Sequence, residues 1–187
     1  MGVLRRYQSE IYGAYRKAYL KYGLITGACF CLYIVVCLLA GSPLSAPETY
    51  GIDAILIIGI LLFSYLYRRN IPGGQIYLKE LMLLGIGIGV VGAVVYGLFL
   101  MVYGAAIDTE FPARCMEAYI ANVQNSQNDE QMKFQTIETM RHYTIYHWGL
   151  IAMFRLSVFS ILAAFISALV FRSGPSPVRP KKEKINK

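Results

Sequence analysis

The sequence contains few charged residues, and two long stretches of it contain none. Only 16% of its 187 residues are Asp, Glu, Lys or Arg, and 56% are hydrophobic. A typical soluble domain is about a quarter charged and about half apolar. Residues 23–40 and 81–107 carry no charge at all, and an uncharged apolar run of roughly 18 residues or more is typical of a helix that crosses a membrane. This composition excludes a soluble enzyme and a nucleic-acid-binding domain.

Cysteine and histidine are also scarce. Three of the four cysteines lie inside the first apolar run, and no two cysteines have the CxxC spacing. We therefore expect them to pack as small apolar residues, which excludes a disulfide-stapled secreted module. Glu138 and His142 share one predicted helical face with His147 nearby, but histidines beside Tyr143 and Trp148 are more typical of a membrane interface than of a metal site. The sequence predicts no metal, no cofactor and no catalytic group.

The basic residues are concentrated in three segments of the chain. The sequence has 18 Lys and Arg against 11 Asp and Glu, and fourteen of the basic residues lie in residues 1–21, 68–79 and 172–187. Basic residues are retained on the cytoplasmic side of membrane helices, so these segments mark the inner face. The positive charge is therefore a signal of topology, and we expect no nucleic-acid partner.

The apolar runs predict an all-α integral membrane domain over residues 22–171. Its bundle of four transmembrane helices is expected at about residues 22–40, 52–67, 81–105 and 148–171, since a hydrocarbon core of about 30 Å takes about 20 helical residues. Pro and Gly predict turns at residues 41–48 and 68–75. An even number of spans places all three basic segments on one side. We therefore expect a bacterial inner-membrane protein with both termini in the cytoplasm, residues 172–187 forming a basic tail.

Residues 1–21 combine basic side chains with tyrosines at near-helical spacing, and Tyr22 continues the series. One interpretation is an interfacial amphipathic helix that lies on the inner leaflet, with its rings at headgroup depth and its cations on anionic lipid. The other is an ordinary aromatic belt beside a positive-inside flank. Both interpretations remain open from the sequence, and neither implies catalysis.

Residues 108–147 form the one long polar segment, with six acidic residues against three basic ones. Pro112 suits the first turn of a helix, and Asn128 is a plausible N-cap for a second helix. The pattern predicts an extracytoplasmic helical hairpin between spans three and four. This hairpin either offers a surface to a partner or simply caps the bundle.

Glycines in the third span suggest helix packing. Residues 87–92 match GxGxxG, but the match lies in an uncharged run without the strand and aqueous βαβ unit that a nucleotide site needs. Small residues recur at every fourth position along one ridge: Gly85, Gly89, Ala93 and Gly97. Such spacing lets helix backbones approach closely. Gly23 and Gly27 on the first span offer a matching groove, so we expect spans one and three to touch there.

Arg155 is the one basic residue inside the last apolar run. It lies seven residues after Trp148, which places it about 10 Å below the outer boundary at ~1.5 Å per residue. Asp53, near the outer end of the second span, is the obvious counter-ion. The pattern favours a structural Arg155–Asp53 ion pair or an arginine that snorkels to the interface. The alternative is a site for a lipid phosphate or an anionic substrate.

Several stretches together resemble a known bacterial family. A basic inner turn is followed by GGQIYLKE at residues 73–80 and a glycine-rich span at residues 81–103, and DTEF at residues 108–111 opens the acidic segment. With the closing apolar span and the basic tail, residues 22–171 resemble the family Domain of Unknown Function 4199. The resemblance implies an inner-membrane protein of four spans, and it supplies no activity and no catalytic residues.

We therefore expect a non-enzymatic membrane protein that serves as an accessory or scaffold subunit. It would contact the lipid bilayer and pack against a protein partner or a second copy through the glycine ridge or the acidic hairpin. Its plan resembles the small four-span proteins that accompany polyprenyl-phosphate glycosyltransferases, which is an analogy of fold alone. The alternative is a small carrier or lipid-binding protein that uses Arg155 for an anionic headgroup or substrate.

Overall fold

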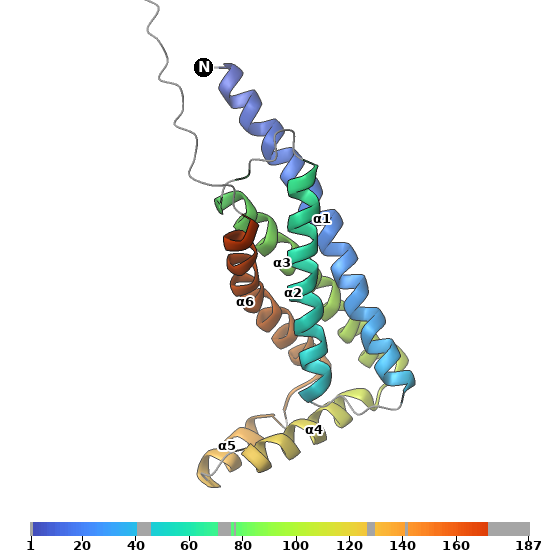
Figure 1. Cartoon of the computed structure of the whole chain (residues 1–187). Helices are drawn as coiled ribbons and strands as arrows, with labels where there is room; N and C mark the ends of the chain where they lie inside the picture. Colours follow the sequence, from blue (N-terminus) through green and yellow to red (C-terminus); the bar gives the residue numbers. More distant parts are fainter. Residues whose placement is uncertain are drawn as a thin grey trace, which may run out of the picture.

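The computed structural model describes residues 2–40, 46–70, 76, 78–126, 130–140 and 142–171. Within these ranges all regular structure is helical, which confirms the all-α class. The elements in chain order are α1 (Gly2–Leu39), α2 (Ala46–Arg69), α3 (Leu78–Val102), the π-helical turn η1 (Tyr103–Ile107), α4 (Phe111–Ser126), α5 (Glu130–Met140) and α6 (Ile145–Phe171) (Figure 1).

Four of these segments are long and apolar enough to cross a membrane: Tyr15–Leu39, Tyr50–Arg69, Leu78–Ile107 and Ile145–Phe171. Each overlaps one of the spans predicted from the sequence, so the prediction of four apolar helices is confirmed. The helices are longer than the predicted spans because their ends extend into tyrosine, arginine and lysine, which suit the membrane–water interface. This arrangement indicates a multi-pass membrane protein.

The helix ends differ from the predicted turns in a way that one residue explains. α2 begins at Ala46, so Pro47 and Glu48, which we expected in a turn, are helical. Proline is tolerated in the first turn of a helix because its missing N–H would have no helical partner there. Residues 41–45 and 71–75 of the predicted turns, and the predicted N-cap Asn128, lie outside the described residues.

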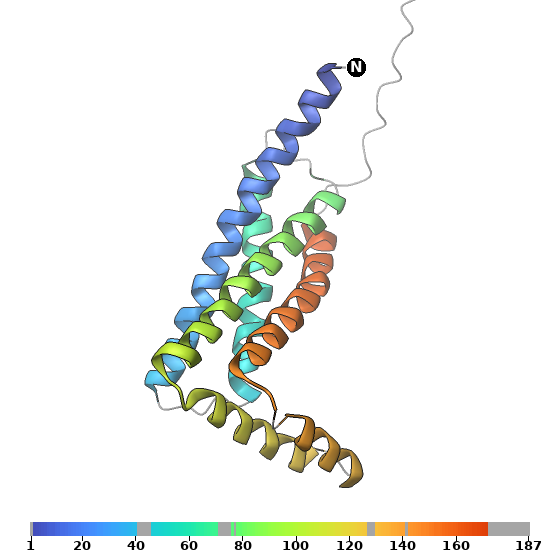
Figure 2. The same ribbon diagram turned by 180° about the vertical axis from the view of Figure 1, so that it is seen from behind.

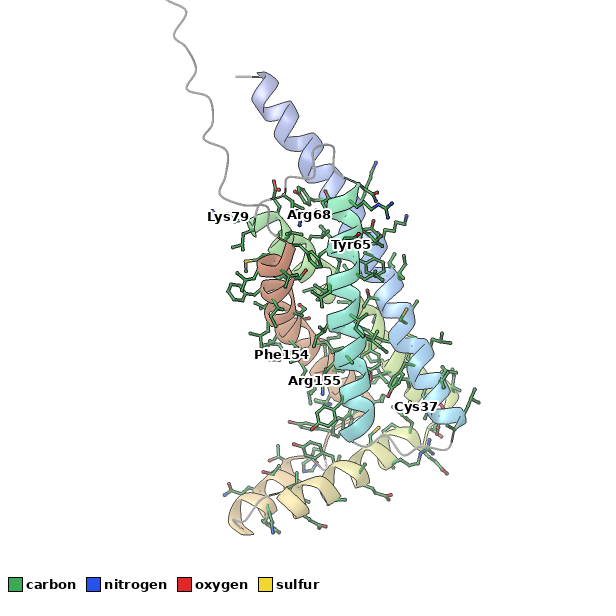
Figure 3. All side chains as sticks on the ribbon, in the orientation of Figure 1. Cys37, Tyr65, Arg68, Lys79, Phe154 and Arg155 are labelled. Atoms are coloured by element: carbon green, nitrogen blue, oxygen red, sulfur yellow. The ribbon has the colours of Figure 1, made fainter. Side chains whose placement is uncertain are left out.

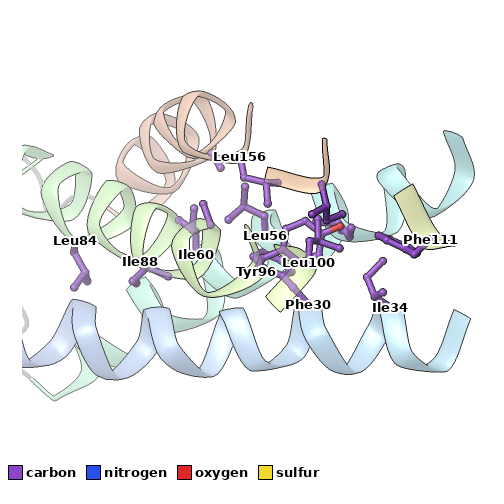
Figure 4. Close-up of a cluster of buried hydrophobic side chains, with 14 residues drawn as sticks. Phe30, Ile34, Leu56, Ile60, Leu84, Ile88, Tyr96, Leu100, Phe111 and Leu156 are labelled. Atoms are coloured by element: carbon purple, nitrogen blue, oxygen red, sulfur yellow. The ribbon is translucent and has the colours of Figure 1, made fainter. Parts of the chain in front are cut away.

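The bundle is organised around α3. α3 packs most extensively against α6 and then α1, and α2 contacts α1, α3 and α6 (Figures 1 and 2). Its core is a cluster of large apolar side chains contributed by all four long helices, among them Phe30, Ile34, Leu56, Ile60, Ile88, Tyr96 and Leu156 (Figure 4). The outer faces of the same helices are apolar too, and Leu39, Phe154 and Leu32 are 83%, 73% and 65% exposed. Exposed apolar surface on this scale suits contact with lipid chains.

α1 continues through Tyr22 without a break, and its amino-terminal end projects past the other helices (Figure 1). Tyr15 is buried and packs on Tyr67 of α2 with ring centroids 5.4 Å apart, and Tyr22 stacks on Phe63 at 4.6 Å. These two rings therefore hold α1 against α2. The structure lacks the turn at Tyr22 that a separate helix lying on the inner leaflet would require.

α4 and α5 pack against each other at one end of the bundle. α4 crosses that end and carries α5 out beyond α6 (Figures 1 and 2). Pro112 lies in the first turn of α4, as its sequence position predicts. We refer to α4 and α5 together, residues 111–126 and 130–140, as the α4–α5 hairpin.

Candidate functional site

Asp53 and Arg155, which we paired from the sequence, lie side by side in the structure. Nη2 of Arg155 donates a hydrogen bond to Oδ1 of Asp53 at 2.6 Å. The Arg155 side chain is 43% exposed and the Asp53 side chain 22% exposed. Arg155 lies on α6 beside α2 (Figure 3). The ion pair therefore joins two candidate spanning helices and is partly exposed on the outside of the bundle.

The two residues meet because α2 and α6 pack together with their first residues at the same end of the bundle (Figure 1). Asp53 follows the buried Ile52, and Arg155 precedes the buried Leu156. Each charged residue thus sits at the edge of the helix face that packs inward. Helical side chains lean toward the start of their helix, so both lean toward the hairpin end of the bundle.

Asp53 satisfies only part of the hydrogen-bonding capacity of Arg155. A guanidinium presents several N–H donors in a fork, and among the residues that the structure describes Asp53 is the single hydrogen-bonding partner of Arg155. Charged groups at membrane depth are costly and need partners. Because the Arg155 side chain is 43% exposed, water or a lipid headgroup can accept hydrogen bonds from the remaining donors.

A second polar cluster fixes the junction between α3 and the hairpin. The backbone N–H of Asp108 donates to the carbonyl of Tyr103 at 2.9 Å and closes the π-helical turn, and its own carbonyl accepts from the N–H of Phe111 at 3.1 Å. Its Oδ1 accepts from the N–H of Glu110 at 3.2 Å, and the Tyr103 hydroxyl donates to Oδ2 at 3.5 Å. Arg114 also donates to Oδ2. One carboxylate therefore ties the end of the third span to the first turn of α4.

The electrostatics of this junction follow from Arg114. Its hydrogen bond and charge hold the pKa of Asp108 below the usual range, and Asp108 in turn raises the pKa of Arg114. Glu110 adds a weaker ion pair to Arg114 at 3.8 Å. The carboxylate of Asp108 thus stays ionised at neutral pH. We did not predict this contact from the sequence, although an arginine early in a helix that follows an Asp is a signal that could have suggested it.

Aromatic rings connect α4 and the residues before α6 to the first turn of α6. Trp148 packs edge-on against Tyr119 of α4 at 5.6 Å and against Tyr143 at 6.2 Å, and Tyr143 stacks on His147 at 5.2 Å. The Trp148 Nε1 is buried and has no hydrogen-bond partner among the described residues. The hairpin therefore contacts the bundle at the first turn of α4, through Arg114 and Asp108, and again at Tyr119 in the middle of α4.

His147 contacts the residue just before α6. Its Nδ1 lies 2.9 Å from the Thr144 hydroxyl and accepts a hydrogen bond from the Thr144 N–H at 3.2 Å. Within the described ranges no group of three or more His, Cys, Asp or Glu is placed to hold a metal ion.

The small residues of α3 pack differently from our expectation. A Cβ at Gly85 would lie 2.7 Å from the Cβ of Ala164, and Ser160 of α6 stands opposite Gly89. Gly97 faces Met153 and Gly149 of α6. The ridge therefore packs on span four rather than on span one, and the predicted pairing was wrong in its partner.

The groove on α1 is filled from another face of α3. Val91 lies against Gly23 and Val95 against Gly27, at 2.6 Å from the Cβ position of each glycine. Spans one and three thus do touch, through glycine against valine. Ala93, the remaining member of the predicted ridge, is fully buried in the core cluster. The signal we missed is the matching run of small residues on α6: Ser160, Ala163, Ala164, Ser167 and Ala168.

The chain matches the model of a protein family. A family model described as "Protein of unknown function (DUF4199)" matches residues 21–173. No curated protein and no solved structure matches the chain. The family match covers all four candidate spans from Tyr22 onward together with the α4–α5 hairpin, and it confirms the resemblance seen in the sequence.

Proposed function

The chain belongs to the DUF4199 family, and we propose that it is a non-enzymatic accessory or scaffold subunit of a complex in the bacterial inner membrane. The observation that carries this proposal is the α4–α5 hairpin. It is joined to the bundle at Asp108 and Trp148, and it extends beyond α6 (Figure 2). A helical surface that contacts the bundle at these two points and projects past it suits contact with a neighbouring protein.

Charge supports an orientation for this proposal. Arg68 at the end of α2 and Lys79 at the start of α3 lie at the end of the bundle away from the hairpin (Figure 3). By the positive-inside rule that end faces the cytoplasm. We therefore propose that residues 1–21 and 172–187 are cytoplasmic and that the hairpin is extracytoplasmic.

The hairpin offers an apolar anchor within a polar surface. Phe134 on α5 is 70% exposed, and the neighbouring Gln135 and Glu138 are also exposed. A large exposed aromatic ring with a polar rim is typical of an interaction surface. As the first partner class to test we propose a polyprenyl-phosphate glycosyltransferase, because small four-span accessory proteins share this plan; this step is an analogy of fold.

Purification from native membranes with a matched pair of variants tests the proposal. Phe134 and Phe154 are 70% and 73% exposed, but the first lies on the hairpin and the second on the lipid-facing side of α6. We expect native mass spectrometry to find the protein in a stoichiometric complex that Phe134→Ala disrupts and Phe154→Ala preserves. A protein that leaves native membranes as a monomer, or a complex equally insensitive to both changes, would contradict the proposal. A mass that is a multiple of this chain would assign the surface to a second copy.

A further inference from the structure

The position of Arg155 along α6 places its guanidinium within reach of the lipid headgroups of one leaflet. Arg155 lies seven residues beyond Trp148, or about 10 Å along the helix at ~1.5 Å per residue. Trp148 belongs to the aromatic cluster at the hairpin end, and such clusters are typical of the membrane–water interface. Since the side chain leans toward the start of its helix, the guanidinium points back toward that interface.

Arg155 is surrounded on α6 by side chains that we expect to contact lipid. Its neighbours on the outer side of α6 are apolar and exposed: Leu150 at 58%, Ile151 at 42%, Phe154 at 73% and Val158 at 47%. A ligand that reaches the 43% exposed side chain of Arg155 therefore passes through lipid. This favours a molecule that carries acyl chains over a free anion from water.

The N–H groups of Arg155 that do not bond to Asp53 indicate which chemical group such a molecule presents. One N–H is bonded to Asp53 at 2.6 Å, and the rest of the guanidinium fork has no partner among the described residues. Arginine binds phosphate through two parallel hydrogen bonds, which makes it the preferred side chain for this group. A phospholipid in the leaflet on the hairpin side has its phosphate near the depth of the guanidinium. Its acyl chains can pack against the exposed apolar side chains of α6.

We propose that Arg155 binds the phosphate of an anionic phospholipid in that leaflet, beside its contact with Asp53 where α2 and α6 pack together. Asp53 holds the guanidinium in place and, as a like charge to phosphate, limits the affinity. This proposal is independent of the accessory role proposed above. It has a consequence that a purely structural ion pair lacks: removing the charge of Asp53 should strengthen lipid binding, because the repulsion disappears while Arg155 stays.

Lipid retention in nanodiscs of equimolar phosphatidylglycerol and phosphatidylethanolamine tests the proposal by native mass spectrometry. We expect Arg155→Ala to lower the retention of phosphatidylglycerol by about tenfold or more, the range of a charge-assisted hydrogen bond. Asp53→Asn should raise this retention above the wild-type level. Arg155→Lys should give a value between wild type and Arg155→Ala, because lysine cannot form the paired hydrogen bonds. Arg114→Ala is the control, since that side chain is 52% exposed on the hairpin, and it should match wild type.

Three results would overturn the proposal. Equal retention by wild type and Arg155→Lys or Arg155→Ala would show that the guanidinium does not bind the lipid. Retention by Asp53→Asn that is no higher than that of wild type would show that the charge of Asp53 does not oppose a bound phosphate. Displacement of the retained lipid from detergent-solubilised protein by millimolar inorganic phosphate would show that the site takes a free anion. Asp53→Asn and Arg155→Lys keep the test decisive if Arg155→Ala fails to fold.

Discussion

A single methyl group at Gly85 should destabilise the bundle, whereas the same change at Gly92 should have little effect. Both glycines are buried in α3, and both face another helix. A Cβ at Gly85 would lie 2.7 Å from the Cβ and 3.0 Å from the Cα of Ala164. At Gly92 the nearest atom would be Cε2 of Phe30 at 3.3 Å, followed by a backbone oxygen at 3.5 Å. The two substitutions therefore match in chemistry and differ in available space.

The magnitude follows from these distances. Carbon atoms in contact lie about 3.5–4.0 Å apart, so α3 and α6 must separate by roughly 1 Å at Gly85. Ala164 has no rotamer that would relieve the contact. Overpacking of this kind costs about 1–3 kcal/mol, and the better helix propensity of alanine returns at most about 1 kcal/mol. We expect Gly85→Ala to lower the free energy of unfolding by about 1–2 kcal/mol. At Gly92 the small cost of moving the Phe30 ring opposes the same gain in helix propensity, so Gly92→Ala should change the free energy of unfolding by less than about 0.5 kcal/mol.

Titration of the purified protein from mild detergent into sodium dodecyl sulfate measures this difference. Trp148 is the single tryptophan in the chain, so its fluorescence reports unfolding at the junction of α6 and the hairpin. Gly89→Leu, which forces a larger side chain against Ser160, should shift the midpoint further than Gly85→Ala. Equal midpoints for Gly85→Ala and Gly92→Ala would refute the close packing of α3 on α6.

Three further predictions concern single contacts. Asp53→Arg and Arg155→Asp together exchange the two charges of the ion pair and should restore most of the thermal stability that each single change removes. A double variant no more stable than either single variant would show that the contact at 2.6 Å does not stabilise the bundle. Because Arg114 lowers the pKa of Asp108, the stability this contact gives is present above the unfolded pKa of about 3.9 and is lost as pH falls through the lower native value. Asp108→Asn should therefore speed amide hydrogen exchange in α4 at neutral pH, while wild type stays protected to about pH 4; unchanged exchange would exclude this anchoring role. Trp148→Phe should cost far less than Trp148→Ala in thermal stability, since the buried Nε1 has no partner to lose; equal losses would contradict this.

The four helices could be predicted because lipid imposes a simple constraint on the sequence. Every backbone polar group in a hydrocarbon core must be bonded within its own helix, so an uncharged run such as residues 81–107 has one stable structure. The Asp53–Arg155 contact was also predictable, since a charge inside the membrane needs a partner and the sequence offers few. Both predictions rest on the cost of placing polar groups in lipid.

The choice of neighbours within the bundle could not be predicted in the same way. The repeat of small residues at Gly85 and Gly89 identifies a face of α3 but not the helix that packs on it. Gly23 offered one matching partner, and Ser160 and Ala164 offered another. Which helix packs on the glycine ridge depends on the packing of the whole bundle, in which α3 presents this ridge to α6 and its valines to α1.

The tyrosines near the start of α1 show a related limit. Regular spacing of Tyr15 and Tyr22 among basic residues fits an amphipathic helix on the inner leaflet as well as an aromatic belt beside a positive-inside flank. The contacts of these rings with Tyr67 and Phe63 of α2 could not be predicted from that spacing. The spacing of residues in the sequence shows which of them share a helix face. Which helix packs on that face depends on the tertiary structure.

Labelling of single cysteines with a membrane-impermeant maleimide tests the central claim most directly. In a cysteine-free background, Phe134→Cys places a thiol on the hairpin and Arg69→Cys places one at the opposite end of the bundle, both at exposed positions. We predict that Phe134→Cys is labelled in cells with a permeabilised outer membrane and an intact inner membrane, and that Arg69→Cys is labelled only after the inner membrane is opened. Labelling of both cysteines, or of Arg69→Cys alone, in cells with an intact inner membrane would contradict a four-span protein with its hairpin outside.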